Sequence, residues 1–266
     1  MEAVAKQVDL GPRPSGSPED EKARALIVES LQANGWEATR QEFTDSTPRG
    51  PVKFINIIGR YPGVAGHPTA TSTQQAIVCS HYDTKRFSTI RFVGASDGAS
   101  STGALLELAR VLALDPAMAA KIELVFFDGE EAVENFTDTD GLWGSRYYAS
   151  SLRADGRARQ FKFAILWDMI GDRDLTVTLP PNSPPDLAKG LFSAADKLGT
   201  RQNFGYFGHD ILDDHVPLQK AGIASMDIID FEYLYWHTAD DTLDKLSGDS
   251  LQKVGAATLF LLRQRL

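Results

Sequence analysis

Short apolar runs alternate with amphipathic segments along most of the chain. Three apolar runs bounded by polar residues are typical of strands buried at the centre of a sheet: 76–80, 121–128 and 161–168. Four other segments space their apolar residues as one face of a helix does: 101–114, 142–154, 185–198 and 246–266. Strands that alternate with helices in this way indicate an α/β protein.

The N-terminal part of the chain is predicted to form a helix followed by two strands. Ser17 has the position of a helix N-cap, Pro18 that of the first helical residue, and acidic residues follow in the first turn. The apolar residues keep helical spacing until the Asn-Gly-Trp sequence at 34–36 ends the helix. The residues at 36–43 and 52–61 are then predicted to be strands.

This order of elements predicts a three-layer α/β/α sandwich with a central mixed, mainly parallel sheet and helices on both faces. The segment 63–75 is rich in Gly, Pro, Ser and Thr and is predicted to be a loop. Because no internal repeat or linker interrupts the pattern, we expect residues 1–266 to form a single domain.

Composition narrows the class of protein further. The chain is 42% hydrophobic but has no apolar run near the roughly 18 residues of a membrane span, so we expect a soluble globular protein. A net charge of −9 without a Lys/Arg cluster argues against a nucleic-acid partner. The single cysteine, Cys79, excludes an intramolecular disulfide and is expected to be buried. The N-terminus has no basic segment followed by an apolar one, so no signal peptide is predicted.

Acidic and histidine residues follow the predicted strands where the strands end. Ligands of open α/β sheets bind at the carboxyl ends of the strands, so these residues are candidates for one site. They come from five strand ends or adjoining loops: His81, Asp83, Asp97, Glu130, Glu131, Asp168, Asp213, Asp214, His215, His237 and Asp240. Taken singly, each is explained by helix capping, a solvated turn or a hydrogen-bonded core position. Together they offer the donor types that zinc prefers, and we predict a metal site at this edge.

The adjacent residues Glu130 and Glu131 point to the same chemistry. Neighbouring carboxylates repel each other, and burial raises the cost of ionising either one. The positive charge of a nearby metal ion would offset both the repulsion and the cost of ionisation. One glutamate would then bind the metal while the other stays free to transfer protons.

The chain resembles the zinc-dependent aminopeptidase fold over nearly its whole length. The motifs HYDT, SDG, DGEE, DMIGD and WHTADD occur in the order found in that fold. Aminopeptidases of this fold hold two zinc ions that share a bridging aspartate. The resemblance implies two ligand sets and a general base, Glu130. These sets are His81, Asp97 and Asp168 for one zinc, and Asp97, Glu131 and His237 for the other.

A closer resemblance is to glutaminyl cyclases, and among them to the bacterial members. The nine residues AVENFTDTD separate the glutamate pair from GLWGSR, and the cyclases have an insertion of this length with an aromatic residue in it. They also share the sequence DDH followed by an apolar residue and proline, and a Trp directly before the last histidine ligand. Animal cyclases carry a disulfide near the HYD motif, which a chain with one cysteine cannot form.

The cyclase resemblance implies conversion of the N-terminal glutamine of peptides or proteins to pyroglutamate, with release of ammonia. It implies one zinc ion, bound by Asp97, Glu131 and His237. Glu130 would stay unligated and act as general acid and base. His81 would then be a hydrogen-bonding residue instead of a ligand of a second zinc.

The same resemblance implies roles for residues around the zinc. Asp168 and Asp213 are expected to be hydrogen-bonding partners around Glu130 and the substrate amine. Phe136, at a position where the cyclases usually have Trp, and Trp236 are expected to line the substrate pocket.

The remaining candidates are expected to be structural. Asp83 and Asp240 are predicted either to support the metal-site histidines or to cap a helix or turn. His215 is expected to be a structural histidine, and neither His67 nor His209 is given a role.

Two other functions are left open. One is a two-zinc aminopeptidase that hydrolyses N-terminal residues. The other is a catalytically inactive relative that serves as a binding domain, although the intact ligand set argues against it. An unrelated α/β hydrolase with a serine nucleophile elbow is not expected. Relatives of the cyclases are commonly exported, so we expect a periplasmic or secreted protein, and a monomer.

Overall fold

The computed structural model describes residues 1–62, 74–137 and 139–266. The described helices are α1 (Glu2–Asp9), α2 (Pro18–Ala33), α3 (Ser101–Leu112), α4 (Pro116–Ala119), α5 (Trp143–Ala154), α6 (Pro185–Lys197), α7 (His215–Lys220) and α8 (Gly248–Arg265). The described strands are β1 (Glu37–Thr47), β2 (Gly50–Arg60), β3 (Ala76–His81), β4 (Ile122–Phe127), β5 (Phe163–Asp168), β6 (Val177–Leu179), β7 (Phe204–Tyr206) and β8 (Ser225–Ile229).

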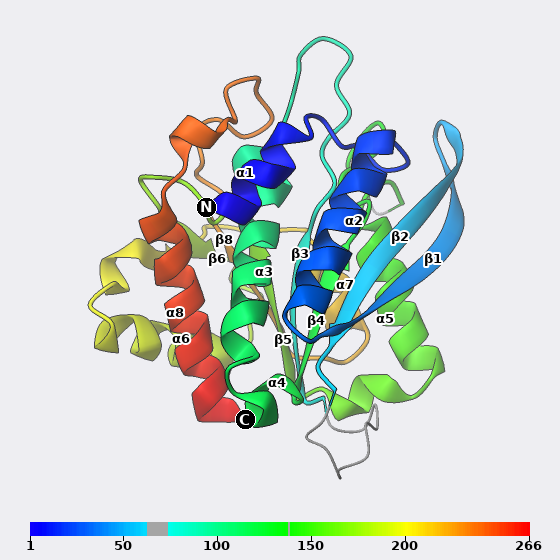
Figure 1. The fold of residues 1–266 in the computed structure, drawn as a ribbon. Helices are drawn as coiled ribbons and strands as arrows, with labels where there is room; N and C mark the ends of the chain where they lie inside the picture. The colour runs from blue at the N-terminus through cyan, green and yellow to red at the C-terminus, as the bar shows by residue number, and fades with distance from the viewer. Residues whose placement is uncertain (63–73, 138) are drawn as a thin grey trace.

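The central sheet has the strand order β1-β2-β4-β3-β5-β8. The strands β4, β3, β5 and β8 are parallel to one another, whereas β1 and β2 add an antiparallel pair at one edge. Helices α2, α3, α6 and α8 pack on one face of the sheet, and α5 and α7 on the other (Figure 1). The predicted three-layer sandwich with a mixed, mainly parallel sheet is confirmed.

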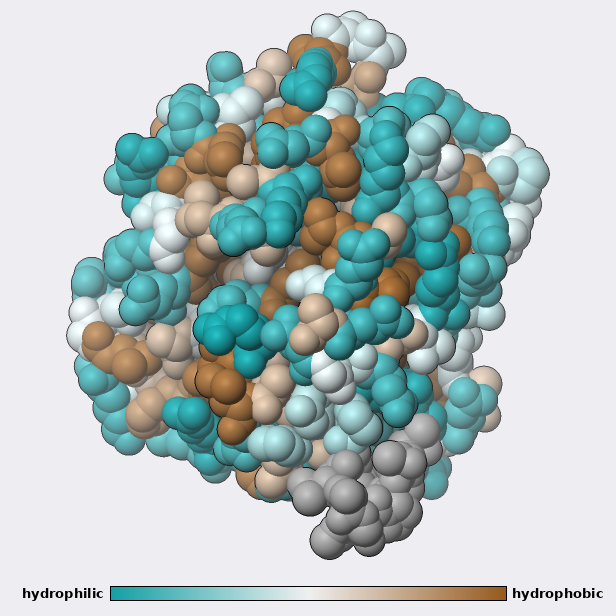
Figure 2. Space-filling model, in the orientation of Figure 1, coloured by the Kyte–Doolittle hydropathy of each residue, from teal (hydrophilic) through white to brown (hydrophobic). Residues whose placement is uncertain are grey.

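The central strands read as continuous apolar runs because both faces of the sheet are covered. In β3, the side chain of Val78 belongs to the core beneath α2 and α3, whereas Ile77 and Cys79 point to the opposite core. There they join Tyr148 and Leu152 of α5. The burial predicted for Cys79 is confirmed. The outer sides of the helices on the first face carry mainly hydrophilic side chains (Figure 2).

Local signals in the sequence locate most of these elements. The predicted helix begins at Pro18, and the Ser17 hydroxyl accepts a hydrogen bond of 3.1 Å from the backbone N–H of Asp20. Strand β8 is not predicted by its sequence, because Asp227 interrupts its apolar residues. The loop predicted at 63–75 lies mostly outside the described residues. Among the helices that the structure describes, none combines the length and apolar character needed to cross a membrane.

A buried ion pair holds the segment that leads into the glutamate pair. The Asp128 carboxylate directly follows β4 and lies 3.1 Å from the Arg24 guanidinium of α2. It also accepts hydrogen bonds from the backbone N–H of Ile55 (2.8 Å) and from the Ser15 hydroxyl (2.7 Å). The same guanidinium is 2.5 Å from the carboxylate of Asp20. One cation thus joins α2, β2 and the end of β4.

We expect Arg24→Met to lower the free energy of unfolding by about 3–5 kcal/mol, because it leaves two buried carboxylates without their cation. Chemical denaturation followed by circular dichroism measures this change. Arg110→Met removes a guanidinium from an exposed ion pair with Glu107 and should leave the midpoint of chemical denaturation unchanged. Equal midpoints for the two variants would show that the buried pair does not stabilise the fold.

Candidate metal and catalytic site

Three parallel strands bring distant parts of the sequence to one edge of the sheet. Strand β3 ends at His81, the residues after β4 include Glu130 and Glu131, and β5 ends at Asp168. Because these strands are parallel neighbours, their carboxyl ends lie side by side. All four side chains are buried.

Asp97 lies between the two histidines of the cluster. Its Oδ1 is 3.2 Å from Nε2 of His81, and its Oδ2 is 3.4 Å from Nε2 of His237. Burial raises the pKa of Asp97, but the two imidazoles outweigh burial and hold that pKa below its usual range. Buried Oδ2 accepts no hydrogen bond from the described residues. A single carboxylate therefore presents one oxygen to each histidine.

The turn that carries Asp97 is held from both sides. Gly98 has a φ of +88°, and a Cβ atom there would lie 2.8 Å from the backbone oxygen of Asp83, so glycine is required. On the other side, the Asp241 carboxylate accepts hydrogen bonds from the N–H groups of Ser96 (2.8 Å) and Asp97 (3.2 Å). These contacts position the carboxylate of Asp97.

Asp241, and not the predicted Asp240, is the acidic residue that supports the cluster. The side chain of Asp240 is exposed, whereas Asp241 is buried and also accepts a hydrogen bond of 2.7 Å from the Tyr233 hydroxyl. The two are adjacent in an irregular loop, so only the path of the backbone decides which one faces inward. The interpretation of Asp240 as a partner of a metal-site histidine is therefore wrong.

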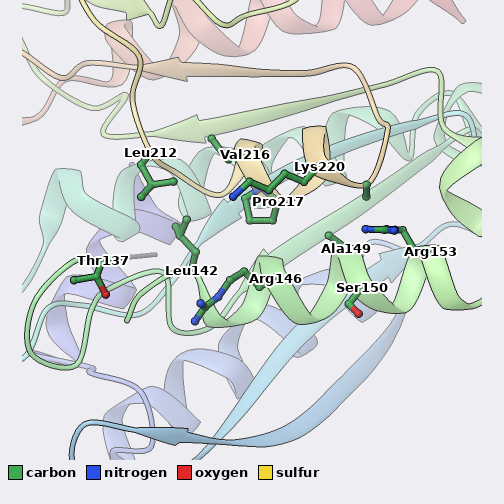
Figure 3. Close-up of a pocket in the computed structure, with 11 residues that line it drawn as sticks. Thr137, Leu142, Arg146, Ala149, Ser150, Arg153, Leu212, Val216, Pro217 and Lys220 are labelled. Atoms are coloured by element: carbon green, nitrogen blue, oxygen red, sulfur yellow. The ribbon is translucent and has the colours of Figure 1, made fainter. Parts of the chain in front are cut away.

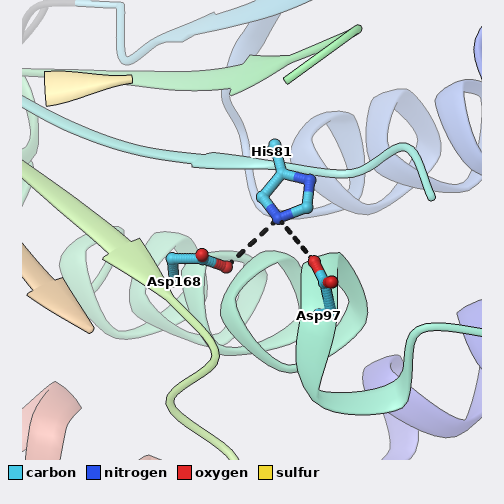
Figure 4. Close-up of side chains that lie close together, drawn as sticks. All are labelled: His81, Asp97 and Asp168. Atoms are coloured by element: carbon cyan, nitrogen blue, oxygen red, sulfur yellow. Dashed lines mark hydrogen bonds and ion pairs between the residues drawn. The ribbon is translucent and has the colours of Figure 1, made fainter. Parts of the chain in front are cut away.

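The first group of possible metal ligands consists of His81, Asp97 and Asp168 (Figure 4). Nε2 of His81 lies 3.1 Å from Oδ1 of Asp168, and its Nδ1 lies 3.5 Å from Oδ1 of Asp83. Burial lowers the pKa of His81, but the surrounding carboxylates, Asp168 foremost, outweigh burial and raise that pKa well above its usual value. The imidazole is enclosed, with 1% of its side-chain surface exposed.

The second group consists of Asp97, Glu131 and His237, whose donor atoms all lie within 4.8 Å of one another. Nε2 of His237 is 3.0 Å from Oε1 of Glu131. The backbone N–H of Lys85 donates to the same oxygen at 3.1 Å. Burial raises the pKa of Glu131 to about 7, with the charge of Asp97 adding to it and His237 opposing it. His237 is 26% exposed, so this group opens to the surface.

Glu130 lies beside the second group but is in neither ligand set. The backbone N–H groups of Glu130 and Glu131 donate to the two oxygens of the Asp83 carboxylate, at 3.2 and 3.3 Å. Burial raises the pKa of Glu130 well above its usual value, and the charges of Glu131 and Asp213 raise it further. A carboxyl group with a raised pKa is suited to both accepting and donating a proton near neutral pH.

A cavity of about 470 Å³ opens onto this cluster. Among its lining residues are most of the predicted site residues: Asp97, Glu130, Glu131, Phe136, Asp168, Asp213, Trp236 and His237. His81 is not among the lining residues, but its imidazole contacts Asp97 and Asp168, which are. Of the two expected partners of Glu130, Asp168 accepts a hydrogen bond from His81, and Asp213 accepts one from the N–H of Asp214.

The insertion after the glutamate pair forms one wall of the cavity. The buried Asp140 carboxylate accepts hydrogen bonds from three consecutive N–H groups, those of residues 133, 134 and 135, at 2.7 to 3.0 Å. Phe136 packs against Gly141, is 42% exposed and lines the cavity. Sequence reasoning did not single out Asp140, although an acidic residue at the end of a loop is a common acceptor for loop N–H groups.

Arg13 is a second residue that sequence reasoning missed. Its buried guanidinium donates to the backbone oxygens of Tyr82 (2.7 Å), Val93 (2.6 Å) and Gly94 (3.0 Å). It thereby connects the end of β3 to the segment that leads to Asp97. The only sequence signal is its place in GPRPSG, a short segment rich in Gly and Pro.

The histidines outside the cluster differ in setting. His215 is buried, its Nε2 lies 3.3 Å from Oδ1 of Asn182, and burial lowers its pKa to about 4. A neutral, hydrogen-bonded imidazole is the structural histidine that was expected. His209 lies in an exposed loop, and His67 lies outside the described residues.

Known proteins match almost the whole chain. Residues 56–262 match the model of Peptidase family M28. The glutaminyl-peptide cyclotransferase of Bos taurus is 32% identical over 93% of this chain and 79% of the bovine protein. The crystal structure of the Acidobacteriales bacterium glutaminyl cyclase is 36% identical, with a TM-score of 0.89 over 99% of this chain and 92% of that chain.

An aminopeptidase relative has a similar fold. The structure described as a leucine aminopeptidase precursor from Bacteroides thetaiotaomicron is 27% identical, with a TM-score of 0.87 over 100% of this chain and 96% of that chain. The other relatives favour the cyclase among the functions predicted from the sequence, and the resemblance to glutaminyl cyclases is confirmed. The chain belongs to peptidase family M28 and, within that fold, to the glutaminyl-peptide cyclotransferases.

Proposed function

We propose that the cluster closes the N-terminal glutamine of peptides into pyroglutamate and releases ammonia. The observation that carries the proposal is the position of Glu130. It is a buried carboxyl group with a raised pKa, in the cavity beside a possible metal site but outside both ligand sets. A residue so placed can move a proton between two atoms of one bound substrate.

The second group would hold a single zinc ion. Two carboxylates and one imidazole are a donor set that zinc accepts, and catalytic sites keep a further position open. The buried Oδ2 of Asp97, which accepts no hydrogen bond from described residues, fits a metal ligand. The bound ion would act as a Lewis acid that polarises the side-chain amide of the glutamine.

The exposure of the two histidines favours the second group over the first. His237 is 26% exposed and lines the cavity, so a substrate oxygen can reach the position beside it. His81 is 1% exposed and is enclosed by Asp97 and Asp168. We therefore assign His81 to hydrogen bonding with these two carboxylates.

The proton balance of the reaction needs one carboxyl group. The substrate amine attacks the side-chain amide carbon, so a carbon–nitrogen bond forms in the ring and the bond to the leaving nitrogen breaks. Glu130 takes the proton that the attacking amine loses and gives it to the departing nitrogen, which leaves as ammonia. Asp168 and Asp213, which line the same cavity, would orient the substrate amine.

The aromatic side chains that line the catalytic cavity would orient the substrate glutamine. Phe136 and Trp236, 42% and 43% exposed, both line the cavity. Ring closure requires the glutamine side chain to fold back so that its amide carbon lies next to the α-amine of the same residue. Holding that conformation removes much of the entropic part of the barrier.

The assay that tests this function measures ammonia release from a glutaminyl dipeptide amide. We expect Glu130→Gln to reduce kcat by about 10²–10⁴-fold, because the amide cannot accept the proton. Glu134→Gln is the matched control, since Glu134 lines the same cavity but is exposed. Release of a chromogenic group from a leucine substrate, without ammonia release, would instead establish an aminopeptidase.

The metal content separates one bound ion from two. We expect purified protein to hold about one equivalent of zinc, and His237→Gln to lose it because one of three ligands is gone. His81→Gln should retain the metal. Two equivalents in the wild type, with one lost in His81→Gln, would show that Asp97 bridges two ions.

The support from Asp241 can be tested through metal affinity. We expect Asp241→Ala to weaken zinc binding about 10–100-fold, since the turn that carries Asp97 loses two hydrogen bonds. Competition with a chromophoric chelator measures the affinity. Asp240→Ala, a change at the exposed neighbour, is the control. An equal loss of zinc affinity in both variants would contradict the role of Asp241 in positioning Asp97.

A further inference from the structure

A second cavity adjoins the catalytic one, between α5 and α7 (Figure 3). We name it the α5–α7 cavity; its volume is about 210 Å³. Leu212 lines both cavities, and Thr137, at one end of the α5–α7 cavity, directly follows Phe136 of the catalytic cavity. The α5–α7 cavity therefore begins where the catalytic cavity ends.

The α5–α7 cavity is basic, although the chain has a net charge of −9. Arg146 and Arg153 of α5 and Lys220 of α7 line it, and its lining includes no acidic side chain among the described residues. Arg153 and Lys220 are exposed, and neither forms an ion pair within the part of the chain that the structure describes. Two cations facing one cavity without a carboxylate leave their charge available to a ligand.

The catalytic cavity has the opposite charge at its outer parts. Asp210 and Glu134, both exposed, are among its lining residues, although Glu134 lies 3.5 Å from Arg49; the basic residue Lys85 also lines this cavity. An acidic peptide leaving the catalytic cavity would be repelled on those sides and attracted toward Arg153 and Lys220. Ala149 of α5 and Pro217 of α7, which also line the α5–α7 cavity, offer apolar contact to the peptide.

We propose that the α5–α7 cavity binds an acidic side chain of the substrate peptide, downstream of the N-terminal glutamine. The proposal rests on the proposed function, because the glutamine must occupy the catalytic cavity. From Arg146 to Arg153, α5 rises about 10 Å, which an extended peptide spans with about three residues. With the first or second residue of the peptide beside Arg146, the acidic residue would be about the fourth or fifth of the peptide. Arg153 binds its carboxylate with a planar pair of donors, and Lys220 adds a second charge.

The test compares glutamine-initiated hexapeptide amides that are otherwise alanine, with Glu or Gln at one position from the third to the sixth. We expect the wild type to favour Glu over Gln by about fivefold in kcat/KM at the fourth or fifth position, mainly through KM. The preference should fall toward one in 1 M salt, because salt screens exposed charges. In Arg153→Gln/Lys220→Gln, the ratio of the two kcat/KM values should be about one at low salt as well.

The matched control is a double variant that removes two positive charges outside the α5–α7 cavity. Lys189→Gln/Arg263→Gln removes two exposed cations from α6 and α8 and should keep the wild-type preference. Equal kcat/KM for Glu and Gln peptides in the wild type would overturn the α5–α7 site while leaving the cyclase activity established. An equal loss of preference in both double variants would also overturn it. Absence of ammonia from every peptide would refute the proposed function itself.

Discussion

The mutual repulsion of buried carboxylates is the constraint on which the rest of this structure depends. Asp97, Glu131 and Asp168 are buried at one edge of the sheet, where ionising several acids together is costly. The described residues offset this cost with imidazoles: His81 and His237 lie 3.0 to 3.4 Å from carboxylate oxygens. In the proposed function a metal ion provides the larger part of the positive charge. Burial raises the pKa of Glu130, and the charges of the neighbouring carboxylates raise it further.

A second ring of carboxylates uses the backbone to hold the cluster. The Asp83 carboxylate accepts hydrogen bonds from the N–H groups of the glutamate pair. Asp241 accepts them from the turn that carries Asp97, and Asp140 accepts them from the insertion. Backbone N–H donors stabilise a carboxylate without adding another titrating group. These loops are irregular, so their N–H groups lack the partners that a helix or strand provides. One kind of contact therefore satisfies the loops and positions the site.

The cluster by itself does not distinguish ring closure from peptide hydrolysis. Relatives with both kinds of name share the fold at TM-scores near 0.9. Around the cluster, this chain has one histidine open to the cavity, His237, one that is enclosed, His81, and a wall formed by the insertion with Phe136. In the proposed function, these features determine how a substrate reaches the residues that would bind the metal and in what conformation it is held. The chemistry of a shared site is selected by its surroundings.

The sequence by itself determined the five strands up to Asp168, the buried runs and the types of ligand, because these follow from local periodicity and residue chemistry. Ser17 and the run at 76–80 are examples. Only the tertiary structure decided that Asp97 presents one oxygen to each histidine and that Asp241, not Asp240, faces inward. It also decided that the polar Asp227 lies in a strand. Such choices depend on the backbone path through irregular loops, and contacts with residues far away in the sequence set that path.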